Sequence, residues 1–276
     1  MLTTTNHDRD EVGMRYVYPV VSRRAGGVSI GINLNPNNAC NWRCCYCQVP
    51  NLTTGHAPAI DLALLGSEFA EMLHWVLHGD FLAQQVDEGM RQLCDIAISG
   101  NGEPTSSPQF AEVVALVLAA MAAAGVPETL PLRLITNGSY VGKAGVQQGL
   151  RMIASHHGEV WIKVDGGDGA TIARTNGVHI SPQQLRQQVE QAAGCCPTWI
   201  QSCMMLSPDG VSMSRQQVDA YLHLLSSLAD SIQGVHLYVP ARLSRQQQVR
   251  PPSAAWMADL VGQLRRLGVS VLLAPD

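Results

Sequence analysis

Lysine, and charge of either sign, are scarce in this sequence. Charged residues make up 14% of the 276 residues, the net charge is -4, and lysine occurs only as Lys143 and Lys163 among 18 basic residues. A chain of this kind lacks the broad basic surface that nucleic-acid binding uses. The run Arg242, Arg245, Arg250 is a candidate for a local basic patch, but such runs usually form a solvated loop.

Long apolar runs are absent as well. Residues 1–16 contain no stretch typical of a signal peptide, and nowhere are there the roughly 18 to 20 consecutive apolar residues needed to span a bilayer. We therefore expect a cytoplasmic protein that does not associate with membranes. In that compartment the eight cysteines are expected to be metal ligands or buried thiols rather than disulfides.

Short β-rich runs alternate with helical patterns along most of the chain. The expected strands cover residues 28–34, 95–100, 132–138, 160–166, 198–205, 235–241 and 269–275, and the expected helices 67–78, 84–93, 109–124, 143–156, 182–193, 215–232 and 253–267. This alternation predicts an α/β fold with parallel strands. We expect a partial (β/α)6-type TIM barrel over residues 28–276, preceded by an N-terminal extension over residues 1–27. A flat doubly wound sheet would give the same pattern.

Polar residues gather where these strands are expected to end. The ends carry Cys40 to Cys47, Gly100 to Thr105, Thr136 and Asn137, Lys163 and Asp165, Cys203, and Arg242. In parallel β/α folds the functional groups cluster at the carboxyl ends of the strands. A shared site is therefore expected there.

The loop after the first expected strand holds four cysteines in eight residues, with Cys40, Cys44 and Cys47 in a C-x3-C-x2-C spacing and Tyr46 before the last. Three thiolates from one short loop can bind three corners of a [4Fe-4S] cluster. The fourth iron then has no protein ligand and can bind a small molecule, whereas four cysteines would close the cluster. Cys45 is interpreted as a non-ligand.

Other metal sites fit the cysteines less well. A zinc site usually pairs two ligand clusters, and no second C-x2-C or His-x3-5-His follows. A C-x4-C-x-C pattern would use Cys45 in place of Cys44. Two residues between the last two ligands, as between Cys44 and Cys47, suit a cluster better than the single residue between Cys45 and Cys47. An auxiliary cluster at Cys195, Cys196 and Cys203 would need groups from opposite ends of one strand, roughly 20 Å apart at about 3.3 Å per residue.

The cysteine loop resembles the radical S-adenosylmethionine (SAM) superfamily, whose signature is C-x3-C-x-(aromatic)-C. The segment Gly100-Asn-Gly102-Glu103-Pro-Thr105 resembles the glycine-glutamate-proline segment of that family. The resemblance covers residues 27–275 and implies a barrel that binds a [4Fe-4S] cluster and SAM.

Within the superfamily the sequence is most similar to the wyosine-synthetase-like group. The shared motifs are Ser29-Ile-Gly-Ile32, Tyr46-Cys-Gln48, Gly100 to Thr105, and Thr136-Asn-Gly138. True wyosine-forming enzymes carry additional cysteines before the signature, and this chain has none before Cys40. That difference counts against the wyosine reaction.

The resemblance also implies SAM contacts at the other strand ends. Gly100 and Gly102 would allow a tight turn and Glu103 would accept from the amino group of SAM. Thr136 and Asn137 would contact its carboxylate, or only form a turn.

Lys163 and Asp165 share one face of their strand. They would meet a carboxylate and the ribose hydroxyls, or pair inside the barrel. Tyr46 would pack near the adenine, or simply anchor the loop. Gln201, which shares a face of the next strand with Cys203, is a further expected contact of SAM.

The expected activity is reductive cleavage of SAM to a 5′-deoxyadenosyl radical, which would take a hydrogen atom from a small-molecule or peptide substrate. Modification of a tRNA base and a non-catalytic Fe-S sensor are the alternatives. The reaction would need a reducing partner such as flavodoxin or ferredoxin. No residue is assigned a catalytic role from the sequence.

Overall fold

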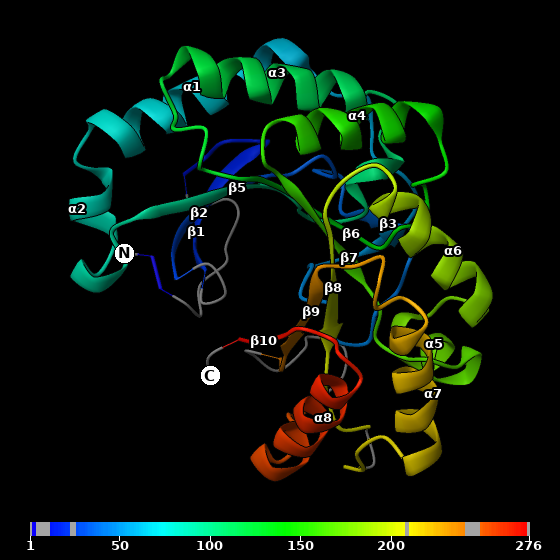
Figure 1. Cartoon of the computed structure of the whole chain (residues 1–276). Helices are drawn as coiled ribbons and strands as arrows, with labels where there is room; N and C mark the ends of the chain where they lie inside the picture. Colours follow the sequence, from blue (N-terminus) through cyan, green and yellow to red (C-terminus); the bar gives the residue numbers. More distant parts are fainter. Residues whose placement is uncertain (1, 4–11, 23–25, 208–209, 241–248, 275–276) are drawn as a thin grey trace.

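The computed structural model describes residues 2–3, 12–22, 26–207, 210–240 and 249–274. Its main sheet has eight strands in the order β1-β2-β5-β6-β7-β8-β9-β10. The strands are β1 Val17–Ser22, β2 Gly27–Ile32, β5 Leu93–Ile98, β6 Leu132–Thr136, β7 Glu159–Lys163, β8 Thr198–Cys203, β9 Gly234–Tyr238 and β10 Val271–Leu273. All neighbours are parallel except β1 and β2, which are antiparallel. The sheet curls into an open half-barrel, as Figure 1 shows, which confirms the expected partial TIM barrel.

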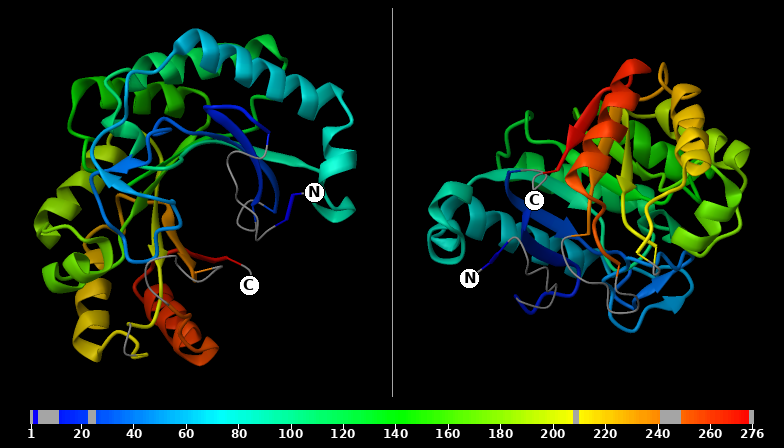
Figure 2. Two further views of the ribbon diagram at one scale, coloured as in Figure 1. Left: turned by 180° about the vertical axis from the view of Figure 1, so that it is seen from behind. Right: turned by 90° about the horizontal axis from the view of Figure 1, so that it is seen from below.

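Helices cover the outer, convex side of the curled sheet (Figure 2). They are α1 Leu62–His78, α2 Phe81–Gln85, α3 Phe110–Ala123, α4 Ala144–Ser155, α5 Gly169–Asn176, α6 Pro182–Ala193, α7 Arg215–Ser226 and α8 Ala254–Arg266. Ser181 and Ser214 begin α6 and α7 with reciprocal capping boxes, which satisfy the first free amides of each helix. Among the described residues no helix is long and apolar enough to cross a membrane.

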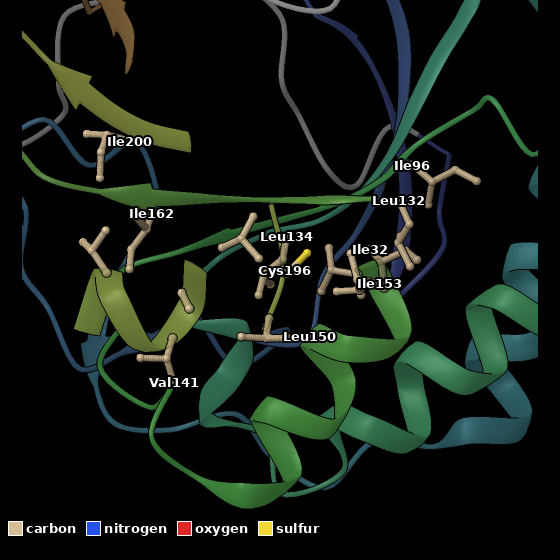
Figure 3. Close-up of a cluster of buried hydrophobic side chains, with 14 of the residues drawn as sticks. Ile32, Ile96, Leu132, Leu134, Val141, Leu150, Ile153, Ile162, Cys196 and Ile200 are labelled. Carbon is tan, nitrogen blue, oxygen red and sulfur yellow. The ribbon is translucent and has the colours of Figure 1, made fainter. Parts of the chain in front are cut away.

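The main core lies between the sheet and these helices. Ile32, Ile96, Leu134 and Ile162 belong to this core and are fully buried (Figure 3). Full burial of such a side chain stabilises the fold by about 1.5 to 3 kcal/mol. Because side chains alternate along a strand, their neighbours point into the concave side, where the sequence has polar and small residues instead.

The seven expected strands are present, but the helices differ from expectation. α1 begins at Leu62 and not at residue 67, and α7 ends at Ser226 and not at residue 232. Residues 84–93 do not form one helix: α2 ends at Gln85, a 3-10 turn spans Glu88–Met90, and β5 begins at Leu93. Gly89 weakens helix formation inside this segment. The short helix α5 was not expected, because it has only eight residues and its three buried side chains include a single apolar one, Ile172.

β1 falls within the expected N-terminal extension and forms one edge of the sheet. Pro19 has no backbone N–H, and an edge strand tolerates this because it has a neighbouring strand on one side only. From β1, Tyr18 lies across Gly31 of β2 so closely that a Cβ atom on Gly31 would overlap the tyrosine ring. The Tyr18 hydroxyl is 2.8 Å from Ser99 Oγ, just beyond β5. Gly31 therefore lets the edge strand reach the concave side of the barrel.

We predict that Gly31→Ala lowers the free energy of unfolding by about 1 to 3 kcal/mol, because the added methyl group displaces the Tyr18 ring. Chemical denaturation measures this change. Gly145→Ala in α4 is the matched control, since its methyl group meets no atom within 4 Å. The control is expected to leave stability unchanged or raise it, and equal stability of the two variants would contradict the packing described.

Candidate active site

A cleft of about 990 Å³ opens at the carboxyl ends of the strands, on the concave side of the sheet. Eleven of the twelve predicted site residues line it: Cys40, Cys44, Tyr46, Cys47, Gly100, Gly102, Glu103, Thr136, Asn137, Lys163 and Gln201. Asp165 does not line it. The fold thus brings together side chains that lie up to about 160 residues apart in the sequence.

The cysteine loop leaves the short strand β3, Ala39–Cys40, which pairs with β4, Thr53–Thr54. The side chains of Cys40, Cys44 and Cys47 line the cleft, whereas Cys45 is turned toward Met205, with Sγ 3.4 Å from Sδ. Burial raises the pKa of Cys40 to about 11 and that of Cys44 to about 12. Without a bound metal these thiols are therefore neutral.

The remaining cysteines lie apart from this loop. Cys196 Sγ is 3.6 Å from the carbonyl oxygen of Gly158, before β8 begins, while Cys203 is the last residue of β8. Cys196 and Cys203 therefore lie at opposite ends of β8. Within the described residues no three His, Cys, Asp or Glu side chains gather closely enough to hold a single metal ion.

The glycines of the Gly100 to Thr105 segment pack against the start of the cysteine loop. A Cβ atom on Gly102 would overlap the carbonyl oxygen of Ala39, the residue before Cys40. Gly100 has a φ of +151° and lies against Asn33. Both glycines are thus needed for close contact between protein segments, in addition to any contact with a ligand.

Glu103 is buried, with 2% of its surface exposed, and its carboxylate joins two strand ends. Its Oε1 accepts from the backbone and hydroxyl of Thr105 and from Thr136 Oγ1 at 2.6 Å, and its Oε2 accepts from Asn137 N at 2.6 Å. Burial raises the pKa of Glu103, and these hydrogen bonds oppose that rise. Asn137 Nδ2 in turn donates to Asn41 Oδ1 at 2.9 Å, inside the cysteine loop.

Lys163 extends from the end of β7 into the cleft. Its ammonium donates to Gln201 Oε1 and to the Tyr238 hydroxyl, each at 3.3 Å, and lies 5.2 Å from the Tyr46 ring centroid. Among the described residues no carboxylate lies within 4 Å of it. The interior ion pair that was the alternative for Lys163 and Asp165 is therefore not formed, and Lys163 presents its ammonium to the cleft.

Asp165 holds protein groups together behind the cleft wall. Its Oδ1 accepts from Cys203 N at 2.7 Å, and its Oδ2 accepts from the Tyr46 hydroxyl at 2.5 Å and from Asn176 Nδ2 at 2.6 Å. This arrangement does not favour the predicted role of Asp165 at a ribose. It does account for Tyr46, whose phenol anchors the cysteine loop to the end of β7.

The opposite, amino-terminal end of the cleft is closed by paired charges. Arg133 forms ion pairs with Asp95 and, at 2.7 Å, with Glu159, and its guanidinium lies 4.9 Å from the Trp161 ring centroid. Ser29 donates to the same Asp95 carboxylate. These groups satisfy one another and form the floor of the cleft.

The structure adds residues that the sequence did not indicate. Tyr18, Asn41, Asn176 and Tyr238 each contact a predicted site residue or its immediate neighbour. Asn41 lies in the cysteine loop and Tyr238 in the expected strand over residues 235–241, so both could have been predicted from their positions. Arg242 and Arg245 of the arginine run lie outside the described residues, and Arg250 is exposed.

We predict that Glu103→Gln lowers the free energy of unfolding by about 1 to 3 kcal/mol, since the amide nitrogen of glutamine faces a buried donor in place of an acceptor. Thermal or chemical unfolding of the metal-free protein measures this. Glu128→Gln, on an exposed loop, is the control and is expected to stay within about 0.5 kcal/mol of the parent. A Glu103 variant as stable as that control would refute the bracing role.

No family model and no curated protein matches the sequence. Solved structures do match. Streptococcus suis SuiB bound to precursor peptide SuiA has a TM-score of 0.57 and 12% identity over 89% of this chain and 48% of SuiB. SuiB bound to S-adenosylmethionine has a TM-score of 0.56 and 12% identity over 89% and 49%. This chain therefore spans about half the length of SuiB.

Archaeal TYW1 matches with a TM-score of 0.41 and 14% identity over 77% of this chain and 74% of that one. That similarity carries no argument for the wyosine-synthetase-like group, which stays a prediction. The agreement with SuiB is an agreement of fold, and at 12% identity it shows the fold alone.

Proposed function

We propose that the chain is a radical SAM enzyme that binds a [4Fe-4S] cluster through Cys40, Cys44 and Cys47. The observation that carries this proposal is the orientation of the four loop cysteines: three thiols line one cleft, and Cys45 faces Met205 instead. When bound, the cluster supplies the electron that cleaves SAM to methionine and a 5′-deoxyadenosyl radical.

The cleft has polar atoms that suit a ligand of this kind. The Gln201 side chain is 1% exposed, and its Nε2 donor has no hydrogen-bond partner among the described residues, although its Oε1 accepts from Lys163. Asn101 Oδ1 is likewise a buried acceptor without a partner there. Buried polar groups are rarely left unpaired, so a polar ligand that supplies both partners is favoured.

SAM offers a carboxylate, an amino group, a ribose and an adenine to these residues. We assign its carboxylate to the Lys163 ammonium and to Asn137, and its amino group to Glu103, whose Oε2 accepts from Asn137 N and has a further lone pair. Gln201 Nε2 donates to a polar atom of SAM other than its carboxylate and amino group. Thr136, Gly100 and Gly102 shape the wall, and Tyr46 positions the loop beside the adenine through its bond to Asp165.

The substrate we propose is a small molecule or a peptide segment. The cleft volume of about 990 Å³ is at the upper end of the roughly 300 to 1,000 Å³ of small-molecule sites. SuiB, which shares the fold, was solved with a precursor peptide. The scarcity of lysine disfavours tRNA as the substrate. A flavodoxin or ferredoxin would deliver the electron.

We predict that Cys44→Ala abolishes cluster binding and SAM cleavage, because one of the three iron ligands is lost. Anaerobic reconstitution should give about four irons per parent chain, and the parent reduced with dithionite should release 5′-deoxyadenosine. Cys45→Ala is the matched control from the neighbouring position and should keep both properties. Equal loss in the two variants would overturn the ligand assignment.

We predict that Lys163→Met weakens SAM binding by about 10- to 100-fold, the effect of losing one charge-assisted hydrogen bond. Calorimetric titration of the iron-loaded protein measures the affinity, and iron content should not change. Lys143→Met replaces the other lysine, which stacks on Tyr140 outside the cleft lining, and should bind SAM as the parent does. Unchanged affinity in Lys163→Met would remove Lys163 from the SAM site.

A further inference from the structure

Helix α5 holds the outer side of the cysteine loop at its carboxyl-terminal end. Arg43 N donates to the carbonyl oxygen of Asn176 at 2.9 Å, and Cys45 N donates to that of Thr175 at 2.8 Å. The last carbonyls of a helix have no partner within the helix. Here the loop supplies their donors.

The end of α5 is shaped for this contact. Gly177 follows with φ +63°, a left-handed conformation that favours glycine, and a Cβ atom there would lie 2.8 Å from the carbonyl oxygen of Arg43. The helix therefore stops where the loop passes, and backbone packs directly against backbone.

The Asn176 side chain reaches further, to the sulfur of Cys44. It is 1% exposed, and its Nδ2 lies 3.4 Å from Cys44 Sγ and 2.6 Å from Asp165 Oδ2. A carboxylate only accepts hydrogen bonds, so the group that faces Asp165 must be the amide NH2. One of its two hydrogens goes to the carboxylate, and the other is then directed at the sulfur.

We propose that Asn176 is a positioning residue of the cluster site, which fixes the Cys44 side chain toward the cleft and donates an N–H···S hydrogen bond to it when it ligates iron. This inference rests on the proposed function. Hydrogen bonds to ligand sulfurs stabilise the additional negative charge of a reduced cluster and raise its reduction potential. The sulfur of Cys45 faces Met205 instead.

The network gives Asn176 a fixed orientation. Asp165 is itself held by Cys203 N at 2.7 Å and by the Tyr46 hydroxyl at 2.5 Å. The carboxamide is thus oriented by a carboxylate that the ends of β7 and β8 and the cysteine loop define together. A side chain without a donor at position 176 loses both contacts.

The test is an EPR-monitored redox titration of the iron-loaded protein in the absence of SAM. In Asn176→Leu, which has a similar volume and no donor, the equilibrium constant for one-electron reduction should fall about tenfold, which is about 59 mV toward more negative potential. Gln217→Ala is the control: Gln217 Nε2 holds the other end of α5 through Thr171 Oγ1 at 3.0 Å and does not reach the loop. Its potential should equal that of the parent.

Asn176→Ser is the second variant, to be measured if Asn176→Leu does not bind iron. If neither variant loads iron while both metal-free forms unfold at the temperature of the metal-free parent, Cys44 is not held in place and the proposal is supported. Normal iron content with an unchanged potential overturns it, as does unfolding of both metal-free variants well below the metal-free parent. A parent chain that loads no cluster would instead contradict the proposed function.

Discussion

Two buried carboxylates hold the cysteine loop from opposite sides, and the geometry of the cleft depends on them. Glu103 accepts a hydrogen bond from Asn137 N, and the Asn137 side chain donates one to Asn41 in the loop. Asp165 accepts a hydrogen bond from the Tyr46 hydroxyl and another from Asn176, whose amide also lies beside Cys44 Sγ. The loop has almost no regular structure of its own, so these bonds fix the directions of its cysteines.

This arrangement couples parts of the chain that are remote in sequence. Each carboxylate is nearly inaccessible, at 2% for Glu103 and 4% for Asp165, and burial of a charge is costly unless hydrogen bonds compensate it. The compensating donors come from β6, β8, α5 and the loop. Folding of the barrel therefore assembles the site, and loss of one donor disturbs several strand ends together.

Much of this could be predicted from the sequence because parallel strands follow a strong rule. Their carboxyl ends share one rim, so Lys163, Gln201 and the Gly100 to Thr105 segment were expected near the cysteines, and they line the same cleft. The partners of Asp165 were not predictable. They come from a short helix, α5, with a single buried apolar side chain, from Cys203 on β8, and from Tyr46, which lies 119 positions away. β1 was missed as well, because Pro19 interrupts the pattern of an ordinary strand.

The central claim is that the cleft brings a cluster with an open iron and SAM into contact. The most direct measurement is the EPR spectrum of the dithionite-reduced, iron-loaded parent protein before and after addition of SAM. We expect SAM to change the signal of the reduced cluster, and 5′-deoxyadenosine to appear as the signal decays. A reduced cluster whose spectrum and lifetime are indifferent to saturating SAM would contradict it.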